Sequence, residues 1–303
     1  MKNLNNSTSF TYDKLDPYFV TGYCDGEASF MVHIDLLKSG KWRITPSFSI
    51  TLHSKDFPLL KSIQSFFGGI GKIYINDKNI IFRVIKLNDI AKVIIPHFNS
   101  YPLLTKKWAD YILFTKVVSI VQTGVHLTEK GLHEILSIKA SINRGLSTKL
   151  ASTYPGVKPI ERPEVDTVLN ISNPSWLVGF VCADGSFSAS NYNDRIKCFR
   201  VRFNVTQHAR DLDLLKAIKR FFNDIGNKYK NGSGYNYEIG SYKDCSKYIL
   251  PFFMKHRFPS VAFKSYNFFI WKEILEIMST GEHKNENGKQ KIVCLLSNIN
   301  KYR

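Results

Sequence analysis

The sequence has few cysteines, and none of them forms a closely spaced pair. Five are scattered through 303 residues, and no C-x-x-C element occurs. An odd number of unpaired positions argues against a disulfide framework and against a cysteine-ligated zinc site. Such usage is typical of a protein that works in a reducing compartment.

Long apolar runs are also missing. Residues 1–12 are polar and rich in Asn and Ser, with neither the apolar core of a secretory signal nor the Arg-rich pattern of an imported mitochondrial leader. The longest apolar stretch, near 111–121, is broken by Thr115 and Lys116 and is too short to cross a bilayer. We therefore expect a soluble protein without a membrane partner, which acts where it is made or carries a sorting signal of another kind.

Acidic residues are scarce beside basic ones. Lys and Arg number 42 against 25 Asp and Glu, which gives a net charge of +17. A surplus of this size indicates a polyanionic partner, nucleic acid before an anionic membrane, and a basic enzyme without such a partner is the plain alternative. The apolar content of 44% is enough for one or two globular domains with proper cores.

Two similar stretches organise the chain, Pro17–Glu27 and Pro174–Asp184, at an offset of 157 residues. A capping residue precedes a proline at the start of each, Asp16 in one and Asn173 in the other, and this order predicts the start of a helix. Small residues recur four positions apart, which lets two helix backbones pack closely. These predicted helix-interface residues are Gly22, Gly26, Gly179 and Ala183.

Each stretch ends in a carboxylate, Glu27 in the first and Asp184 in the second. If the two helices pack together, these carboxylates emerge side by side and repel each other unless a cation lies between them. Oxygen ligands favour Mg²⁺ or a similar hard divalent ion. The plain alternative is a solvated charge near a helix end, but a carboxylate there opposes the helix dipole, and its repetition in both halves favours a metal site.

The flanking segments repeat as well. Ile50–Asp56 recurs as Val205–Asp211 at an offset of 155, and Lys107 pairs with Lys264 at an offset of 157. Alternation of apolar and polar residues predicts strands at 29–36, 43–52, 80–86, 197–206 and 235–242, and helical spacing predicts helices at 56–67, 108–121 and 263–278. Each half thus reads as helix, strand, strand, helix, strand, strand, helix, helix, an α+β fold.

The stretch from Thr153 to Ile171 interrupts the repeat. It carries three prolines and a glycine among mixed charges, a composition typical of a linker. We therefore predict an N-terminal domain at 1–152, a linker at 153–172 and a C-terminal domain at 173–303.

The two stretches resemble the paired motifs of single-chain LAGLIDADG homing endonucleases, because they read V-T-G-Y-C-D-G-E-A and L-V-G-F-V-C-A-D-G. The resemblance covers nearly the whole chain, since the flanking repeats also fit. It implies two pseudo-symmetric domains, each an antiparallel sheet with helices on one face, that form a DNA-binding saddle. It also implies a monomer that makes a double-strand break in a long asymmetric target and leaves short 3′ overhangs. Ala28 departs from the family's usual Gly, and we expect it to perturb the turn into the first strand.

The resemblance also assigns catalytic and metal-binding residues. Lys107 and Lys264 match basic residues near the scissile phosphates, with Lys106 as a rival in the first half. The metal ligands implied are Glu27, Asp184 and backbone carbonyls at Ala28 and Ala183. The implied cofactor is Mg²⁺, with Mn²⁺ substituting for it and Ca²⁺ supporting binding without cleavage. Ser49 and Asn204 take positions where the family often has a polar residue, commonly Gln, that orders water. Asp25 has no symmetric partner, and we expect it to cap or pack.

The polar face of each predicted sheet offers candidates for DNA binding. Arg, Ser, Thr and Asn read base edges and phosphates, and a β-ribbon fits the major groove. The candidates are Arg43, Thr45, Ser47, Ser49 and Arg83 in the first half, and Arg200, Arg202, Asn204 and Glu238 in the second. An ordinary solvated sheet face is the alternative for any one of them, but the set as a whole favours DNA.

Two other functions stay open at this point. One is a maturase that binds its group I intron RNA, with or without cleavage, and the other is a catalytically silent DNA-binding protein on the same scaffold. The presence of both carboxylates and both lysines favours cleavage. The family occurs in fungal mitochondrial introns, and the Asn, Lys, Ile, Phe and Tyr usage suits an AT-rich genome. We therefore expect an organelle-encoded mitochondrial protein, or a cytoplasmic one otherwise.

Overall fold

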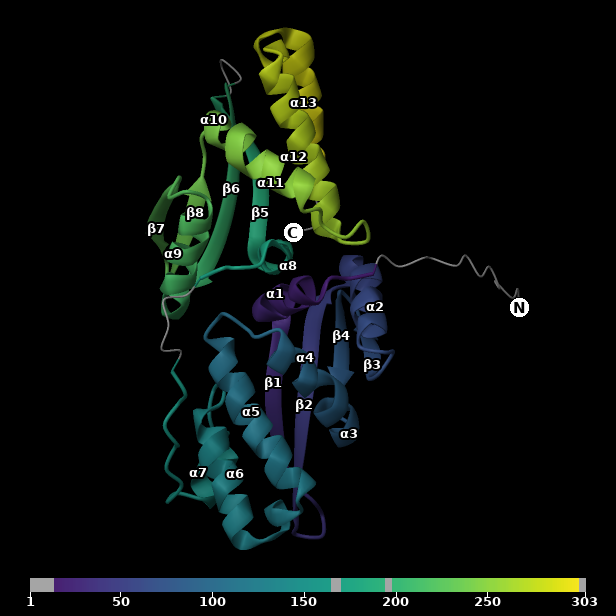
Figure 1. The fold of residues 1–303 in the computed structure, drawn as a ribbon, viewed down its shortest axis with the longest axis vertical. Coiled ribbons are helices and arrows are strands. Elements are labelled where there is room, and N and C mark those ends of the chain that lie inside the picture. Colours follow the sequence, from purple (N-terminus) through teal and green to yellow (C-terminus); the bar gives the residue numbers. More distant parts are fainter. Residues whose placement is uncertain (1–13, 165–169, 194–197, 300–303) are drawn as a thin grey trace, which may run out of the picture.

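The two halves of the chain form two similar units, and the helices Pro17–Glu27 and Pro174–Asp184 make the main contact between them (Figure 1). The computed structural model describes residues 14–164, 170–193 and 198–299. The predictions for residues 1–12, the start of a strand at Lys197 and the end of the C-terminal domain at 300–303 lie outside these residues. Within the described ranges, no helix is long and apolar enough to cross a bilayer.

The first half contains one four-stranded antiparallel sheet with strand order β1-β2-β4-β3. Its elements are α1 (Pro17–Glu27), β1 (Ala28–Leu36), β2 (Trp42–His53), η1 (Ser54–Asp56), α2 (Phe57–Phe66), β3 (Lys72–Asn76), β4 (Asn79–Val84), α3 (Leu87–Asp89), η2 (Ile90–Ile94), α4 (Ile95–Ser100), α5 (Lys107–Gln122), η3 (Val125–Leu127), α6 (Glu129–Ser141) and α7 (Thr148–Thr153).

The second half repeats this order as far as the counterpart of α6 in its described residues, with a sheet of strand order β5-β6-β8-β7. Its elements are α8 (Pro174–Asp184), β5 (Gly185–Asn193), β6 (Cys198–His208), η4 (Ala209–Asp211), α9 (Leu212–Phe221), β7 (Asn227–Asn231), β8 (Gly234–Ile239), α10 (Tyr242–Asp244), η5 (Cys245–Ile249), α11 (Leu250–Lys255), α12 (Phe263–Ser279), η6 (Glu282–Lys284) and α13 (Glu286–Asn298). The predicted α+β architecture and strand alternation are therefore confirmed.

Two predicted strands end earlier than expected. The strand predicted over 80–86 stops at Val84. The strand predicted over 235–242 stops at Ile239, and Tyr242 begins α10 instead. Ser241 explains the change, because its side chain accepts a hydrogen bond from the Asp244 amide and so caps the helix.

Aromatic side chains fill the core between each sheet and its covering helices. Phe30 of β1 lies opposite Phe48 of β2, and Phe187 of β5 lies opposite Phe203 of β6. The ring centroids in these pairs are 5.4 and 5.5 Å apart, and all four side chains are fully buried. Because alternate strand residues point to one face, each sheet buries this face under α5 or α12, and the intervening residues point to the opposite face.

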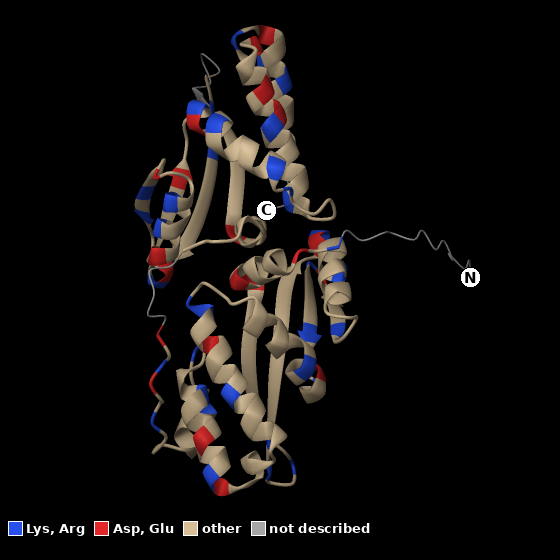
Figure 2. Ribbon diagram, in the orientation of Figure 1, with Lys and Arg blue, Asp and Glu red and all other residues tan. Residues whose placement is uncertain are grey.

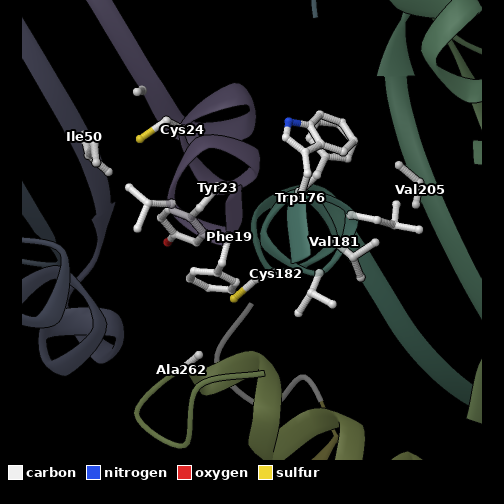
Figure 3. Packing of buried hydrophobic residues seen from close by; sticks show 14 of the residues in the cluster. Phe19, Tyr23, Cys24, Ile50, Trp176, Val181, Cys182, Val205 and Ala262 are labelled. Atoms are coloured by element: carbon white, nitrogen blue, oxygen red, sulfur yellow. The ribbon is translucent and has the colours of Figure 1, made fainter. Parts of the chain in front are cut away.

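Helices α1 and α8 lie side by side at the centre of the molecule, with apolar side chains packed around them (Figure 3). A Cβ added to Gly22 would lie 1.9 Å from the Trp176 carbonyl oxygen, and one added to Gly179 would lie 2.0 Å from that of Phe19. The two backbones are therefore in direct contact. One turn further on, Gly26 faces Ala183, so all four small residues of the repeated stretches lie in this interface.

The segment predicted as a linker follows the outside of the first half. Between the end of α7 and the start of α8, the described residues form no helix or strand. Arg162 in this segment donates to Asp110 Oδ1 at 2.8 Å and to the Lys106 carbonyl at 3.2 Å. It therefore contacts the start of α5, while the domain boundaries themselves stay a prediction.

Candidate functional site

The carboxylates of Glu27 and Asp184 lie where the touching helices α1 and α8 end. A Cβ added to Gly26 would be 3.2 Å from Asp184 Oδ2, so the acid of one half borders the backbone of the other. Burial and the charge of Asp184 raise the pKa of Glu27 to about 7. Burial also raises the pKa of Asp184, against the hydrogen bond from Gln207. A cation between the two acids would relieve both unfavourable effects.

Two cavities flank this pair of acids. The Lys107 cavity has a volume of about 260 Å³ and is lined by Glu27, Asp184, Lys107, Gln207 and Asp211, among others. The Lys264 cavity has a volume of about 320 Å³ and is lined by Glu27, His53, Asp56, Lys264 and Asn267, among others. Acidic positions at the ends of α1 and α8 and basic positions at the starts of α5 and α12 gather here (Figure 2).

Each site lysine contacts the end of the motif helix in its own half. Lys107 Nζ donates to the carbonyls of Cys24 at 2.9 Å and Gly26 at 3.0 Å, and burial lowers the pKa of Lys107. Lys264 Nζ donates to the Gly185 carbonyl. Lys106, the alternative to Lys107 in the first half, is exposed, and Lys107 is the one of the two that lines the cavity.

The residues present fit a hard cation that is shared with a substrate. Among the residues in the described ranges, no group of three or more His, Cys, Asp and Glu could hold a metal ion by itself. Two carboxylates and nearby backbone carbonyls form an incomplete oxygen set, which phosphate oxygens would complete. Of the two alanines assigned by the resemblance, Ala28 follows Glu27 and Ala183 precedes Asp184.

The expectation that Ala28 perturbs the turn into β1 is wrong. Its φ and ψ are −80° and 158°, against −82° and 164° for Gly185 at the equivalent position in the second half. This extended conformation is open to any residue, so alanine fits without strain.

Asp25 anchors the loop that leads to Lys107. Its carboxylate accepts hydrogen bonds from the Leu104 amide at 2.8 Å, the Thr105 hydroxyl at 2.7 Å and the Trp176 indole N–H at 2.9 Å. The packing role expected for this residue therefore includes positioning, and Trp176 extends it across the two halves.

Sequence reasoning missed Gln207. Its side-chain N–H donates to Asp184 Oδ2 at 2.8 Å. On β6 it shares the parity of buried Phe203 and Val205, where a polar residue is unusual, and this was the available signal. Its repeat partner is Leu52, so the two cavities differ in this respect. Ser49 and Asn204, the positions predicted to order water, lie opposite Arg83 and Glu238 in the sheets, and that role stays a prediction.

The DNA-binding candidates of the first half differ in exposure. Arg43 is exposed beside Asp35 at 3.3 Å, while Thr45 and Arg83 are half-buried. Ser47 and Ser49 are only 0% and 3% exposed, so these two hydroxyls are covered in this structure.

The candidates of the second half form a charged group. Glu238 Oε1 lies 3.8 Å from Arg200 Nη2 and 3.7 Å from Arg202 Nε. Glu238 Oε2 also accepts from the Tyr229 hydroxyl at 3.0 Å. Glu238 thus holds the two arginines, whereas its repeat partner in the first half is Arg83, of opposite charge.

A sequence model described as LAGLIDADG endonuclease matches residues 20–118 and 177–275, once in each half. The chain belongs to the LAGLIDADG endonuclease family. It is 36% identical over 292 residues to a probable intron-encoded endonuclease 3 of Neurospora crassa, covering 93% of this chain and 54% of the relative. It is 33% identical over 308 residues to a probable intron-encoded endonuclease 2 of the same fungus, covering 96% and 67%. The chain thus spans about half of the first relative's length and two thirds of the second's.

Solved structures of LAGLIDADG endonucleases match the whole fold. The structure of I-SmaMI bound to cleaved DNA has a TM-score of 0.91 at 35% identity and covers 96% of this chain and 99% of that one. I-GzeII in complex with its DNA target has a TM-score of 0.91 at 34% identity, with coverage of 95% and 99%. I-SmaMI bound to uncleaved target with calcium ions has a TM-score of 0.89 at 36% identity, also with coverage of 95% and 99%. The single-chain, two-motif resemblance is therefore confirmed.

Proposed function

We propose that this protein is a site-specific homing endonuclease that makes a double-strand break in a long asymmetric DNA target. The observation that best supports the proposal is the pair of half-buried carboxylates at touching helix ends, with a lysine-lined cavity on each side. Two cavities suit two scissile phosphates, one on each strand. The products are duplex ends with short 3′ overhangs.

Glu27 and Asp184 would hold divalent metal, together with nearby backbone carbonyls at Ala28 and Ala183. We propose Mg²⁺ as the cofactor, with Mn²⁺ substituting for it and Ca²⁺ supporting binding alone. When bound, the metal supplies a Lewis acid that activates water and stabilises the leaving 3′ oxygen. Lys107 and Lys264 would each place a positive charge near a scissile phosphate and so offset its negative charge. The Gln207 amide orients the Asp184 carboxylate through its hydrogen bond.

The sheet faces would bind the DNA on either side of the cut. Arg43, Thr45 and Arg83 serve one half-site and Arg200, Arg202 and Asn204 the other, with Glu238 holding the second set of arginines. Residues 1–152 and 173–303 are then two DNA-binding domains of one monomer, joined by 153–172. The site of action that we propose is the mitochondrion, and the fungal relatives named as intron-encoded endonucleases support it.

A cleavage selection tests this proposal directly. Purified protein with Mg²⁺ is incubated with a DNA library, beside Glu27→Gln, Asp184→Asn and a Ca²⁺ reaction. Double-strand cuts at one long site are expected for the unmodified protein only, while both variants keep binding that site in Ca²⁺. Unchanged cleavage by either variant would contradict the assigned roles. Binding without cutting by the unmodified protein would favour the silent DNA-binding protein or the maturase, and intron RNA would be the next substrate.

A further inference from the structure

Two aspartates outside the motif helices reach across the molecule in the same way. Asp211, after β6, accepts from the backbone N–H of Lys106 at 2.9 Å through Oδ1. Asp56, after β2, accepts from the backbone N–H of Phe263 at 3.2 Å through Oδ1. Asp56 and Asp211 are equivalent at an offset of 155, and Lys106 and Phe263 at an offset of 157. Each contact therefore joins one half to the other, and the pair is reciprocal.

These two contacts act at the start of the helices that carry the site lysines. Lys106 immediately precedes Lys107 at the start of α5, and Phe263 immediately precedes Lys264 at the start of α12. The N-cap residues of these helices, Lys106 and Ala262, make no side-chain capping bond. Amides at a helix start have no partner within the helix, and a carboxylate there is favoured by the helix dipole. The opposite half supplies that carboxylate in both cases.

The surroundings of both aspartates fit a fixed structural contact. Asp211 is 7% exposed, and its second oxygen accepts from Arg210 Nε at 3.2 Å. At the equivalent place in the first half, Lys55 Nζ lies 4.3 Å from the centre of the Phe263 ring. Asp211 lines the Lys107 cavity and Asp56 lines the Lys264 cavity. Each cavity is thus lined by residues of both halves.

We propose that Asp56 and Asp211 are positioning residues, each of which fixes, from the opposite half, the position of the lysine that serves one cleavage centre. The proposal rests on the proposed nuclease function. Asp211 fixes the position of Lys107, and Asp56 fixes the position of Lys264. Loss of one aspartate therefore impairs one strand's cleavage, whereas a general loss of folding would impair both strands alike.

Strand-resolved cleavage tests this assignment. The selected target is labelled on both strands and cut in single-turnover reactions with Mg²⁺ by Asp211→Ala and by Asp56→Ala. Each variant should slow one strand by roughly tenfold, the size expected for loss of a charge-assisted hydrogen bond, and the two should accumulate nicks on opposite strands. Affinity in Ca²⁺ should stay within about twofold, since neither aspartate lies among the proposed DNA-binding residues of the sheets. Equal slowing of both strands, or no slowing, would overturn the proposal.

Two further variants serve as controls. Asp213→Ala removes a neighbouring carboxylate that is 72% exposed and pairs with Lys216, and it should leave both strand rates unchanged. Asp211→Asn keeps an oxygen acceptor for the Lys106 amide and should recover part of the lost rate.

Amide hydrogen exchange gives a readout that needs no cleavage. In metal-free protein, the Lys106 amide should exchange faster in Asp211→Ala, and the Phe263 amide faster in Asp56→Ala, each without the other changing. Unchanged exchange at both amides would overturn the contacts while leaving the nuclease proposal intact. Faster amide exchange in the variants, together with no DNA cleavage by the unmodified protein, would support the two contacts and contradict the proposed nuclease function.

Discussion

Glu27 changes its charge near neutral pH when no metal is bound. Burial and the neighbouring Asp184 raise its pKa to about 7, so the folded protein holds this proton more tightly than the unfolded chain. The contribution of this protonation to the free energy of unfolding is fully present below about pH 4.5 and is lost as the pH rises through about 7. The raised pKa of Asp184 acts in the same direction.

We therefore expect Glu27→Gln to be more stable than the unmodified metal-free protein at pH 8, by about 1–3 kcal/mol, and to match it more closely at pH 5. Buried His97, with a pKa lowered to about 4, destabilises both proteins alike as the pH falls below 6.5, so the difference between them isolates Glu27. Thermal unfolding at several pH values measures this effect. Ca²⁺ should raise the Tm of the unmodified protein more at pH 8 than at pH 5, and an equal rise at both would contradict the assignment of the metal site.

Gln207 offers a second test at the scale of one residue. Its hydrogen bond lowers the pKa of Asp184, so Gln207→Leu should raise that pKa and shift the acid limb of the pH–rate profile upward. Cleavage of one strand should slow by roughly tenfold, the effect of about 1.4 kcal/mol. The matched control is Leu52→Gln, which introduces an amide at the equivalent place in the other half. An unshifted pH profile in Gln207→Leu would show that the amide does not act on Asp184.

Helices α1 and α8 meet backbone to backbone, and this contact fixes where the two acids lie. Gly22→Ala or Gly179→Ala would place a methyl group about 2 Å from a carbonyl oxygen of the other helix. We expect either change to destabilise the protein by about 3 kcal/mol or more, because neither backbone can move without the other. Denaturant unfolding measures the loss, and Gly156→Ala is the control, since nothing lies within 4 Å of the added carbon.

Elements were predictable from sequence where a regular pattern set them. Alternation along β2 and β6 and the proline-capped starts of α1 and α8 gave the strands and helices that the structure contains. The wide helical turns at Ile90–Ile94 and Cys245–Ile249 were not predicted. Each is followed within two residues by a proline, Pro96 or Pro251, which lacks the amide that a regular helix needs, and the apolar pattern carries no sign of this.

The site was predictable only in part for a similar reason. Glu27 and Asp184 could be proposed because they end the two repeated stretches, and Lys107 and Lys264 because they match basic residues of the family that the sequence resembles. The repeat partner of Gln207 is the apolar Leu52, so the repeat does not single out this residue. The crossed contacts of Asp56 and Asp211 depend on how the two halves dock, which no local pattern encodes.

The whole molecule presents two sheets of different chemistry, and this should show in its target. Arg202→Ala should weaken binding by ~1–3 kcal/mol and relax base preference in one half-site only, if the arginine reads a base. Competition binding in Ca²⁺ against targets with single base changes measures both effects. A uniform loss across all sequences would indicate a phosphate contact instead.

The net charge of +17 leads to a further expectation for the whole molecule. Affinity should fall steeply with salt, as it does for proteins that displace counterions from phosphates. Binding titrations at several KCl concentrations measure the slope of the logarithm of the binding constant against the logarithm of the salt concentration. Arg202→Ala should make this slope shallower by about one if that residue contacts a phosphate. A salt-independent affinity would contradict a DNA partner.

The separation of the helix pair from the strands has a consequence for how such proteins change over generations. The glycine contacts between α1 and α8 hold the acids, whereas the side chains proposed to read DNA stand on other elements. Substitutions can accumulate on a strand without displacing the acids, so new recognition can arise while the chemistry is inherited intact. The same separation should allow halves of two such proteins to be recombined, provided that the hybrid preserves the contact between α1 and α8.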